Sequence, residues 1–284
     1  MPLPSLPTIM FEPLVRATLL EDLGRAGDLT TDAIVPQEAT ATLTFAVRQP
    51  GVIAGMGVAS CAFRTIDPTV EMTIAHPDGS SVAAGEVIAT VHGPARALLT
   101  AERTALNFLC RMSGIATATA AVVEAIRGNK ASIVCTRKTT PGLRALEKYA
   151  VRAGGGSNHR FGLDDAVLIK DNHIAIAGDI RAAIERARAG VGHLVKIEVE
   201  VDTLDQLEIA LGVGVDAVLL DNMSPEQLSR AVTMVAGRAI TEASGRVTPQ
   251  TAPAIAATGV DLISIGWLTH SAPILDIGLD YGSL

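Results

Sequence analysis

Aromatic residues are scarce in this sequence of 284 residues: they make up 3 %, and Trp267 is the only tryptophan. Hydrophobic residues nevertheless reach 48 %, which is enough for a sizeable core and excludes disorder as the overall description. The core must therefore be aliphatic. Such a core is typical of α/β proteins with buried parallel strands, and the length fits one large domain or two ordinary ones.

Cysteines are also few, and Cys61, Cys110 and Cys135 have no spacing typical of disulfides or metal sites. No run approaches the roughly 20 apolar residues of a membrane span, and residues 1–8 lack the basic and apolar segments of a signal peptide. The net charge of -7 argues against a general nucleic-acid binder. We therefore expect a cytoplasmic protein that binds neither membranes nor nucleic acid.

The first part of the chain indicates a small domain of mixed structure. Residues 11–23 have helical spacing, and three strand-like runs within residues 42–92 are separated by turn signals. Residues 94–128 are expected to be helical, with a break at Ser113-Gly114. This pattern predicts an N-terminal α+β sandwich domain with a mostly antiparallel sheet.

Strands and helices alternate from residue 131 onward, which implies parallel pairing and right-handed crossovers. An incomplete α/β barrel is the predicted fold, and an open doubly wound sheet is the alternative. We place the first domain at residues 1–114 and the barrel at residues 115–284, whose last residues could return to the first domain. Thr140-Pro141 and Ser224-Pro225 are expected to begin two of the helices. The expected strands are 132–135, 166–169, 194–199, 217–220, 239–242 and 262–265, and the expected helices are 141–152, 179–189, 203–212, 224–236 and 249–258.

Ionisable or small residues follow all six expected strands. In a barrel the carboxyl ends of the strands converge on one face, where active sites are built. The alternative is that strand ends are polar only because they meet solvent. The residues in question are Thr136-Arg137-Lys138-Thr139, Lys170-Asp171-Asn172-His173, Glu198 to Asp202, Asp221-Asn222, Glu242-Ala243-Ser244-Gly245, and Gly266 with His270 soon after.

Positive charge gathers in residues 137–170, which hold seven basic and three acidic residues, a local net charge of +4. Arg144 and Lys148 are expected on a solvated helix surface. The other cations of interest lie at strand ends or beside a glycine run, and they predict a polyanionic ligand. They are Arg137, Lys138, Arg160 and Lys170.

The last strands favour a phosphate site, because Ser244-Gly245 and Gly266 offer backbone N–H donors. Glu200 and Asp221 end neighbouring strands. Two carboxylates in a basic site can hold Mg²⁺ through a diphosphate, or stabilise positive charge that develops on a sugar carbon. The alternative is a structural ion pair with Lys138 or Lys170.

Several long motifs resemble quinolinate phosphoribosyltransferase, and together they cover nearly the whole chain. They are Glu21-Asp22-Leu23-Gly24, Gly27 to Thr31, Glu102 to Asn107, Thr136 to Arg144, Gly154 to Arg160, Lys170 to His173, Glu200-Val201-Asp202, Leu220-Asp221-Asn222 and Thr269-His270-Ser271.

The resemblance implies an enzyme of NAD synthesis. That family transfers phosphoribose from phosphoribosyl pyrophosphate to quinolinate, releases carbon dioxide and pyrophosphate, uses Mg²⁺ and no organic cofactor, and is a homodimer with shared active sites. By this resemblance Lys138, Lys170, Glu200 and Asp221 are the catalytic residues. Quinolinate is expected at Arg137, Lys138, His159, Arg160 and Lys170 with Arg103 from the neighbouring subunit, the metal and ribose at Glu200 and Asp221, and phosphate at Ser244, Gly245, Gly266 and His270.

One position departs from the family pattern, which often has a second glycine where this chain has Arg246. That puts one backbone contact to phosphate in doubt, although an arginine can replace it with its own side chain. Three other functions stay open. They are a related enzyme encoded beside molybdate transporters, which lacks the full Lys-Asp-Asn-His run, a Schiff-base aldolase that uses Lys170, and a non-catalytic anion-binding protein.

Overall fold

The computed structural model describes residues 3–282 and divides into two compact units. The first unit comprises the chain up to Ala120, Thr139–Gly155, and the chain from Thr269. The second unit comprises Ala121–Lys138 and Gly156–Leu268.

The first unit is built on a four-stranded antiparallel sheet in the order β12-β1-β5-β3, with a two-stranded sheet of β2 and β4. β12 comes from the end of the chain and pairs with β1, so that Phe45 lies opposite Leu279. Phe45 also packs edge-on against Phe63 at 6.0 Å between ring centroids, in a mostly aliphatic core. The elements are η1 (Thr8–Met10), α1 (Glu12–Leu23), α2 (Leu29–Ile34), β1 (Thr40–Val47), β2 (Gly51–Val52), α3 (Met56–Ile66), β3 (Glu71–Ile74), β4 (Ser81–Val82), β5 (Val87–Pro94), α5 (Arg144–Ala153) and β12 (Ile277–Tyr281), together with most of α4 (Ala95–Ala125).

Helix α4 is continuous, so the predicted break at Ser113-Gly114 is wrong. The hydroxyl of Ser113 donates to the backbone oxygen of Ala54 and accepts from its N–H, at 3.2 and 3.0 Å. A Cβ on Gly114 would lie 2.1 Å from the backbone oxygen of Pro273. Both residues therefore allow close packing against α4. Among the described residues, α4 is the one helix long and apolar enough to cross a membrane, and 61 % of its most apolar window is buried inside the protein, as in a core helix.

Helix α5 begins at Arg144 rather than at the Thr140-Pro141 cap that the sequence indicates. The N–H of Thr140 instead donates to Glu147 Oε2 at 3.0 Å, and Arg111 Nη2 donates to Glu147 Oε1 at 2.8 Å. Lys148, which was expected on a solvated surface, is 1 % exposed. The charges of this helix therefore belong partly to the core of the first unit.

The second unit is a six-stranded parallel sheet in the order β6-β11-β10-β9-β8-β7. From β7 to β11 the strands follow in sequence order, and β6 lies beside β11. A doubly wound sheet would reverse direction midway, so this order confirms the barrel. Within residues 3–282 the edge strands β6 and β7 do not pair, which leaves the barrel incomplete.

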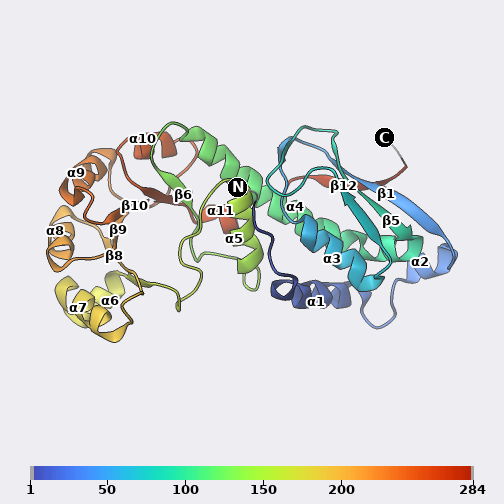
Figure 1. Cartoon of the computed structure of the whole chain (residues 1–284), viewed down its shortest axis with the longest axis horizontal. Helices are drawn as coiled ribbons and strands as arrows, with labels where there is room; N and C mark the ends of the chain where they lie inside the picture. Colours follow the sequence, from blue (N-terminus) through green and yellow to red (C-terminus); the bar gives the residue numbers. More distant parts are fainter. Residues whose placement is uncertain (1–2, 283–284) are drawn as a thin grey trace. The chain divides into compact units, whose positions relative to one another are not determined.

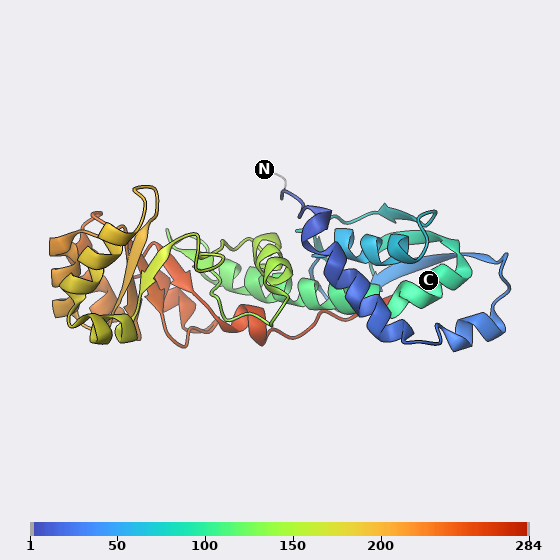
Figure 2. The ribbon, with the colours of Figure 1, turned by 90° about the horizontal axis from the view of Figure 1, so that it is seen from below.

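Helices α6 to α9 lie along the outer side of the strands (Figure 1 and Figure 2). Ser224 caps α9 as predicted, whereas α6 was not predicted and α10 is shorter than the 249–258 expected. The elements are β6 (Ser132–Val134), β7 (Val167–Ile169), α6 (Asp171–Ala177), α7 (Ile180–Gly190), β8 (Ile197–Val201), α8 (Leu204–Val213), β9 (Ala217–Asp221), α9 (Pro225–Val235), β10 (Ile240–Ser244), α10 (Ala252–Ala256), β11 (Leu262–Ser264) and α11 (Trp267–His270), the last of which crosses into the first unit.

Candidate active site

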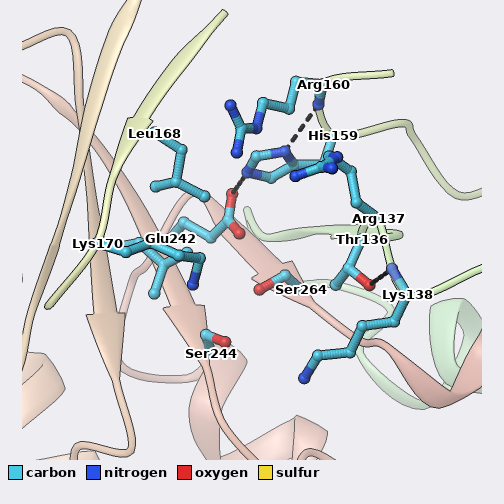
Figure 3. A pocket seen from close by; sticks show the side chains of 11 residues that line it. Thr136, Arg137, Lys138, His159, Arg160, Leu168, Lys170, Glu242, Ser244 and Ser264 are labelled. Carbon is cyan, nitrogen blue, oxygen red and sulfur yellow. Dashed lines mark hydrogen bonds and ion pairs between the residues drawn. The ribbon is translucent and has the colours of Figure 1, made fainter. Parts of the chain in front are cut away.

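A cavity of about 320 Å³ lies within the second unit (Figure 3). Its lining residues come from strands β7, β9, β10 and β11, from the segments that follow β6 and precede β7, and from the end of β7. They include four of the predicted cations together with two hydroxyl groups of the late strands. The lining comprises Thr136, Arg137, Lys138, His159, Arg160, Leu168, Lys170, Leu219, Glu242, Ser244 and Ser264.

Strand register explains which side chains reach this cavity. Leu219 on β9 lies opposite Glu200 on β8 and Glu242 on β10, so the three share one face of the sheet. Side chains two residues further along a strand return to that face, which adds Asp221 and Ser244. The inner face of the barrel therefore carries carboxylates below its rim as well as at it.

Arginine and lysine side chains make the cavity cationic. Arg137 and Lys138 follow β6, where the N–H of Lys138 donates to Thr136 Oγ1 at 3.0 Å. Arg160 Nη1 donates to the backbone oxygen of Ala166 at 3.0 Å, while its buried Nε has no partner among the described residues. Burial and the nearby Arg137 lower the pKa of Arg160. An anion in the cavity would stabilise the positive charge of an arginine held in this way.

Lys170 lies at the end of β7, immediately before helix α6. The backbone N–H of Lys170 donates to His173 Nδ1 at 2.9 Å, which fixes the start of this helix. Its Nζ contacts Glu200 Oε2, so the ion pair considered as the alternative for Glu200 is present in the structure. An amine held in an ion pair suits anion binding better than nucleophilic attack.

The ends of β9 and β10 interlock. Asn222 has a φ of 52°, its N–H donates to Ser244 O at 2.9 Å, and its Nδ2 donates to Asp221 Oδ2 at 2.6 Å. Gly245 has a φ of 112°, and a Cβ there would lie 2.2 Å from Asn222 Oδ1. Only glycine fits this position. The hydrogen bond from the Asn222 amide holds the carboxylate of Asp221 in its orientation.

Glu200 and Asp221 lie on the same inner face of adjacent strands. Carboxylate oxygens are ligands that Mg²⁺ accepts, usually together with substrate phosphates and water. The chemistry of this pair therefore fits a magnesium–diphosphate group.

A second carboxylate cluster lies deeper. His159 Nε2 is 2.9 Å from Glu198 Oε2 and 3.6 Å from Glu242 Oε2, and one ligating atom from each residue lies within 4.8 Å of the others. Burial and the neighbouring Glu198 raise the pKa of Glu242 to about 7. Glu198 and Glu242 are among the strand-end residues named from the sequence, but neither was given a role in the site.

The predicted site residues fall into three groups. Arg137, Lys138, His159, Arg160, Lys170 and Ser244 line the cavity. Glu200, Asp221 and Gly245 adjoin it through the contacts described above, and Gly266 follows β11. Arg103, exposed on α4, and His270, whose Nδ1 is 2.6 Å from Ser271 Oγ, belong to the first unit. The roles of all these residues stay predictions.

Comparison with known proteins gives a consistent result over the length of the chain. Residues 28–113 match the family model of the quinolinate phosphoribosyl transferase N-terminal domain, and residues 115–280 match that of the C-terminal domain. The chain is 48 % identical over 271 residues to nicotinate-nucleotide pyrophosphorylase [carboxylating] of Mycobacterium leprae, covering 94 % of this chain and 95 % of that protein. It is 44 % identical over 272 residues to a probable nicotinate-nucleotide pyrophosphorylase [carboxylating] of Bacillus subtilis, with coverages of 96 % and 93 %. The crystal structure of NadC from Streptococcus pyogenes superposes with a TM-score of 0.94 at 41 % identity, covering 99 % of this chain and 100 % of that one.

Proposed function

The chain belongs to the quinolinate phosphoribosyltransferase family, and we propose that it transfers phosphoribose from phosphoribosyl pyrophosphate to quinolinate. The products are nicotinate mononucleotide, pyrophosphate and carbon dioxide, so the protein is a pentosyltransferase of NAD biosynthesis, a carboxylating nicotinate-nucleotide pyrophosphorylase. The observation that carries this proposal is a small cavity whose lining combines Arg137, Lys138, Arg160 and Lys170. Quinolinate is a planar dianion, and these four cations supply the charge that its two carboxylates require.

The residues of the cavity account for the chemistry mainly by positioning and electrostatics. The cations hold both quinolinate carboxylates, so that the pyridine nitrogen faces the ribose C1. The nitrogen attacks C1 as pyrophosphate leaves, and the carboxylates of Glu200 and Asp221 stabilise positive charge that develops on the sugar. The positive charge on the alkylated nitrogen then stabilises the carbanion that remains on C2 when the adjacent carboxylate departs as carbon dioxide. This carbanion takes up a proton, supplied by solvent, to give nicotinate mononucleotide.

The proposal includes Mg²⁺, which Glu200 and Asp221 would hold. Once bound, it would neutralise charge on the leaving pyrophosphate. Ser244, Gly245, Gly266 and His270 are proposed to bind phosphate. We further propose a cytoplasmic homodimer in which Arg103 serves the neighbouring subunit, with no nucleic-acid or membrane partner.

The direct test is to mix the protein with quinolinate, phosphoribosyl pyrophosphate and Mg²⁺ and to measure nicotinate mononucleotide. Nicotinic acid is the matched control because it lacks one carboxylate. An unpaired charged contact costs about 2–5 kcal/mol, so nicotinic acid should react roughly 30-fold more slowly or worse. Comparable turnover of both acids would contradict the proposal, and EDTA should abolish the reaction if the metal is required.

The Schiff-base alternative has its own experiment. Borohydride should trap no carbonyl substrate on Lys170, because that amine is engaged in an ion pair with Glu200. Covalent trapping there would instead favour an aldolase.

A further inference from the structure

The cluster of His159, Glu198 and Glu242 brings three titratable side chains together beneath the cations of the cavity. They come from the segment before β7, from β8 and from β10. Figure 3 shows the carboxyl group of Glu242 between His159 and the side chains of Lys170 and Ser264. The carboxylate of Glu242 therefore lines a pocket proposed to bind a dianion, and that of Glu198 lies next to it.

The tautomer of His159 decides what this cluster can hold. The backbone N–H of Arg160 donates to His159 Nδ1 at 2.7 Å, so Nδ1 carries a lone pair and the ring proton sits on Nε2. That proton points at Glu198 and Glu242. A metal ion would need the Nε2 lone pair and would move the proton to Nδ1, against the Arg160 N–H. The geometry therefore favours a proton site over a metal site.

Glu242 is the member of the cluster that is least well accommodated as an anion. It is 1 % exposed, and its Oε1 is buried with no hydrogen-bond partner among the described residues. The titratable groups that face it are Glu198 from β8, His159 and Lys170, while β11 contributes the uncharged Ser264. Burial and Glu198 favour the neutral acid, whereas His159 and Lys170 favour the carboxylate, and the pKa of about 7 reflects this balance.

A dianion in the cavity changes that balance. Its carboxylates take up the cations, including Lys170, that otherwise stabilise an ionised Glu242, and they add negative charge nearby. We propose that Glu242 is the proton-carrying residue of this pocket, and that its carboxylate takes up one proton from solvent when the pyridine dicarboxylate binds. The inference rests on the proposed function. It adds a positioning residue, because a neutral Glu242 does not repel the carboxylates of the substrate.

Isothermal titration with quinolinate at pH 7.5, in two buffers of different protonation enthalpy, counts the protons taken up. The wild-type protein should take up most of one proton, and its Kd should weaken by up to about tenfold per pH unit above pH 7.5. Glu242→Gln, a neutral amide of the same shape, should bind with no uptake and with little dependence on pH. Glu226→Gln, which removes an exposed carboxylate on α9, should behave as wild type.

A measurement without substitution guards against a variant that fails to fold. Infrared difference spectra of wild-type protein should gain a protonated-carboxyl band when quinolinate is added, and that band should shift when glutamate is labelled with ¹³C. Proton uptake that persists in Glu242→Gln, or binding without uptake or band, overturns this inference alone. Failure of quinolinate to bind at any pH overturns the proposed function and this inference together.

Discussion

Each unit of this protein contains a glutamate that is only 1 % exposed, and the two glutamates have opposite surroundings. In the first unit Glu147 accepts hydrogen bonds from Arg111 and from the N–H of Thr140, one on each oxygen. In the second unit Glu242 has one oxygen without a hydrogen-bond partner within residues 3–282, and a second carboxylate, Glu198, lies close by. The first arrangement satisfies a charge, and the second leaves it unsatisfied.

This difference separates a structural charge from a functional one. A buried carboxylate that is fully paired contributes to a fixed geometry, and removal of its partner is costly. A buried carboxylate with an oxygen that accepts no hydrogen bond can gain or lose a proton more readily, which suits a ligand site. We infer that the first unit uses buried charge for packing, whereas the second uses it for chemistry.

The test with the largest expected effect asks whether the first unit also contributes to catalysis. Arg103 is exposed on α4, and the family resemblance places it in the neighbouring subunit's site. Arg103→Ala and Lys138→Ala should each lower activity by about 30-fold or more, because each removes a charged contact. In the proposed homodimer, co-refolding should make about half of the dimers mixed, and each mixed dimer has one site with both residues intact.

The mixture should therefore recover about a quarter of wild-type activity. Assay of the co-refolded pair beside each variant alone provides the measurement. Absence of recovery, despite demonstrated subunit exchange, would place Arg103 outside the partner's site and would leave catalysis to the second unit.

The next effect concerns stability. Arg111→Met leaves Glu147 buried without its main partner and should lower the free energy of unfolding by about 3 kcal/mol, as measured in urea. The control is Arg127→Ala, which breaks an exposed pair with Glu124 and should cost less than about 1 kcal/mol. Similar values for the two variants would show that the first unit does not depend on this buried charge.

Glu242 should make the free energy of unfolding of the protein depend on pH. Its pKa is raised from 4.5 to about 7, so between these values the folded protein keeps a proton that the unfolded chain has lost. The stability contributed by this group is complete below pH 4.5 and is lost as the pH rises through about 7, by at most about 3 kcal/mol. Urea unfolding of Glu242→Gln from pH 5 to 8 should lack this decline. Equal slopes for variant and wild type would contradict the raised pKa.

Local pattern was sufficient for much of the fold and for the rim of the site. Strand and helix alternation predicted the barrel, and the residues that follow each strand included Arg137, Lys138 and Lys170, which line the cavity. These features depend on the periodicity of hydrophobic residues and on which residues follow each strand along the chain, and both can be read directly from a sequence.

Tertiary contacts account for what the sequence did not show. Ser113-Gly114 reads as a helix break, yet both residues are used for close approach of other segments to α4. Lys148 reads as a surface charge, yet it is buried. Glu242 was visible as a strand residue, but its environment depends on Glu198 and His159, which are 44 and 83 residues away in the sequence.

The smallest expected effect tests a strained position at the rim of the second unit. Arg246 has a φ of 48°, a left-handed conformation that glycine adopts freely and that costs other residues about 1 kcal/mol. The family pattern often has glycine here, so Arg246→Gly should raise the free energy of unfolding slightly, by up to about 1 kcal/mol, whereas Arg246→Ala should leave it nearly unchanged.

If the guanidinium replaces a backbone contact to phosphate, Arg246→Ala should raise the KM for phosphoribosyl pyrophosphate and leave that for quinolinate intact. Equal losses for both substrates would indicate a general defect, and no change in either would show that Arg246 points only to solvent. Because the glycine variant relieves strain while removing the same side chain, a raised KM in both variants would assign the effect to the guanidinium rather than to the backbone.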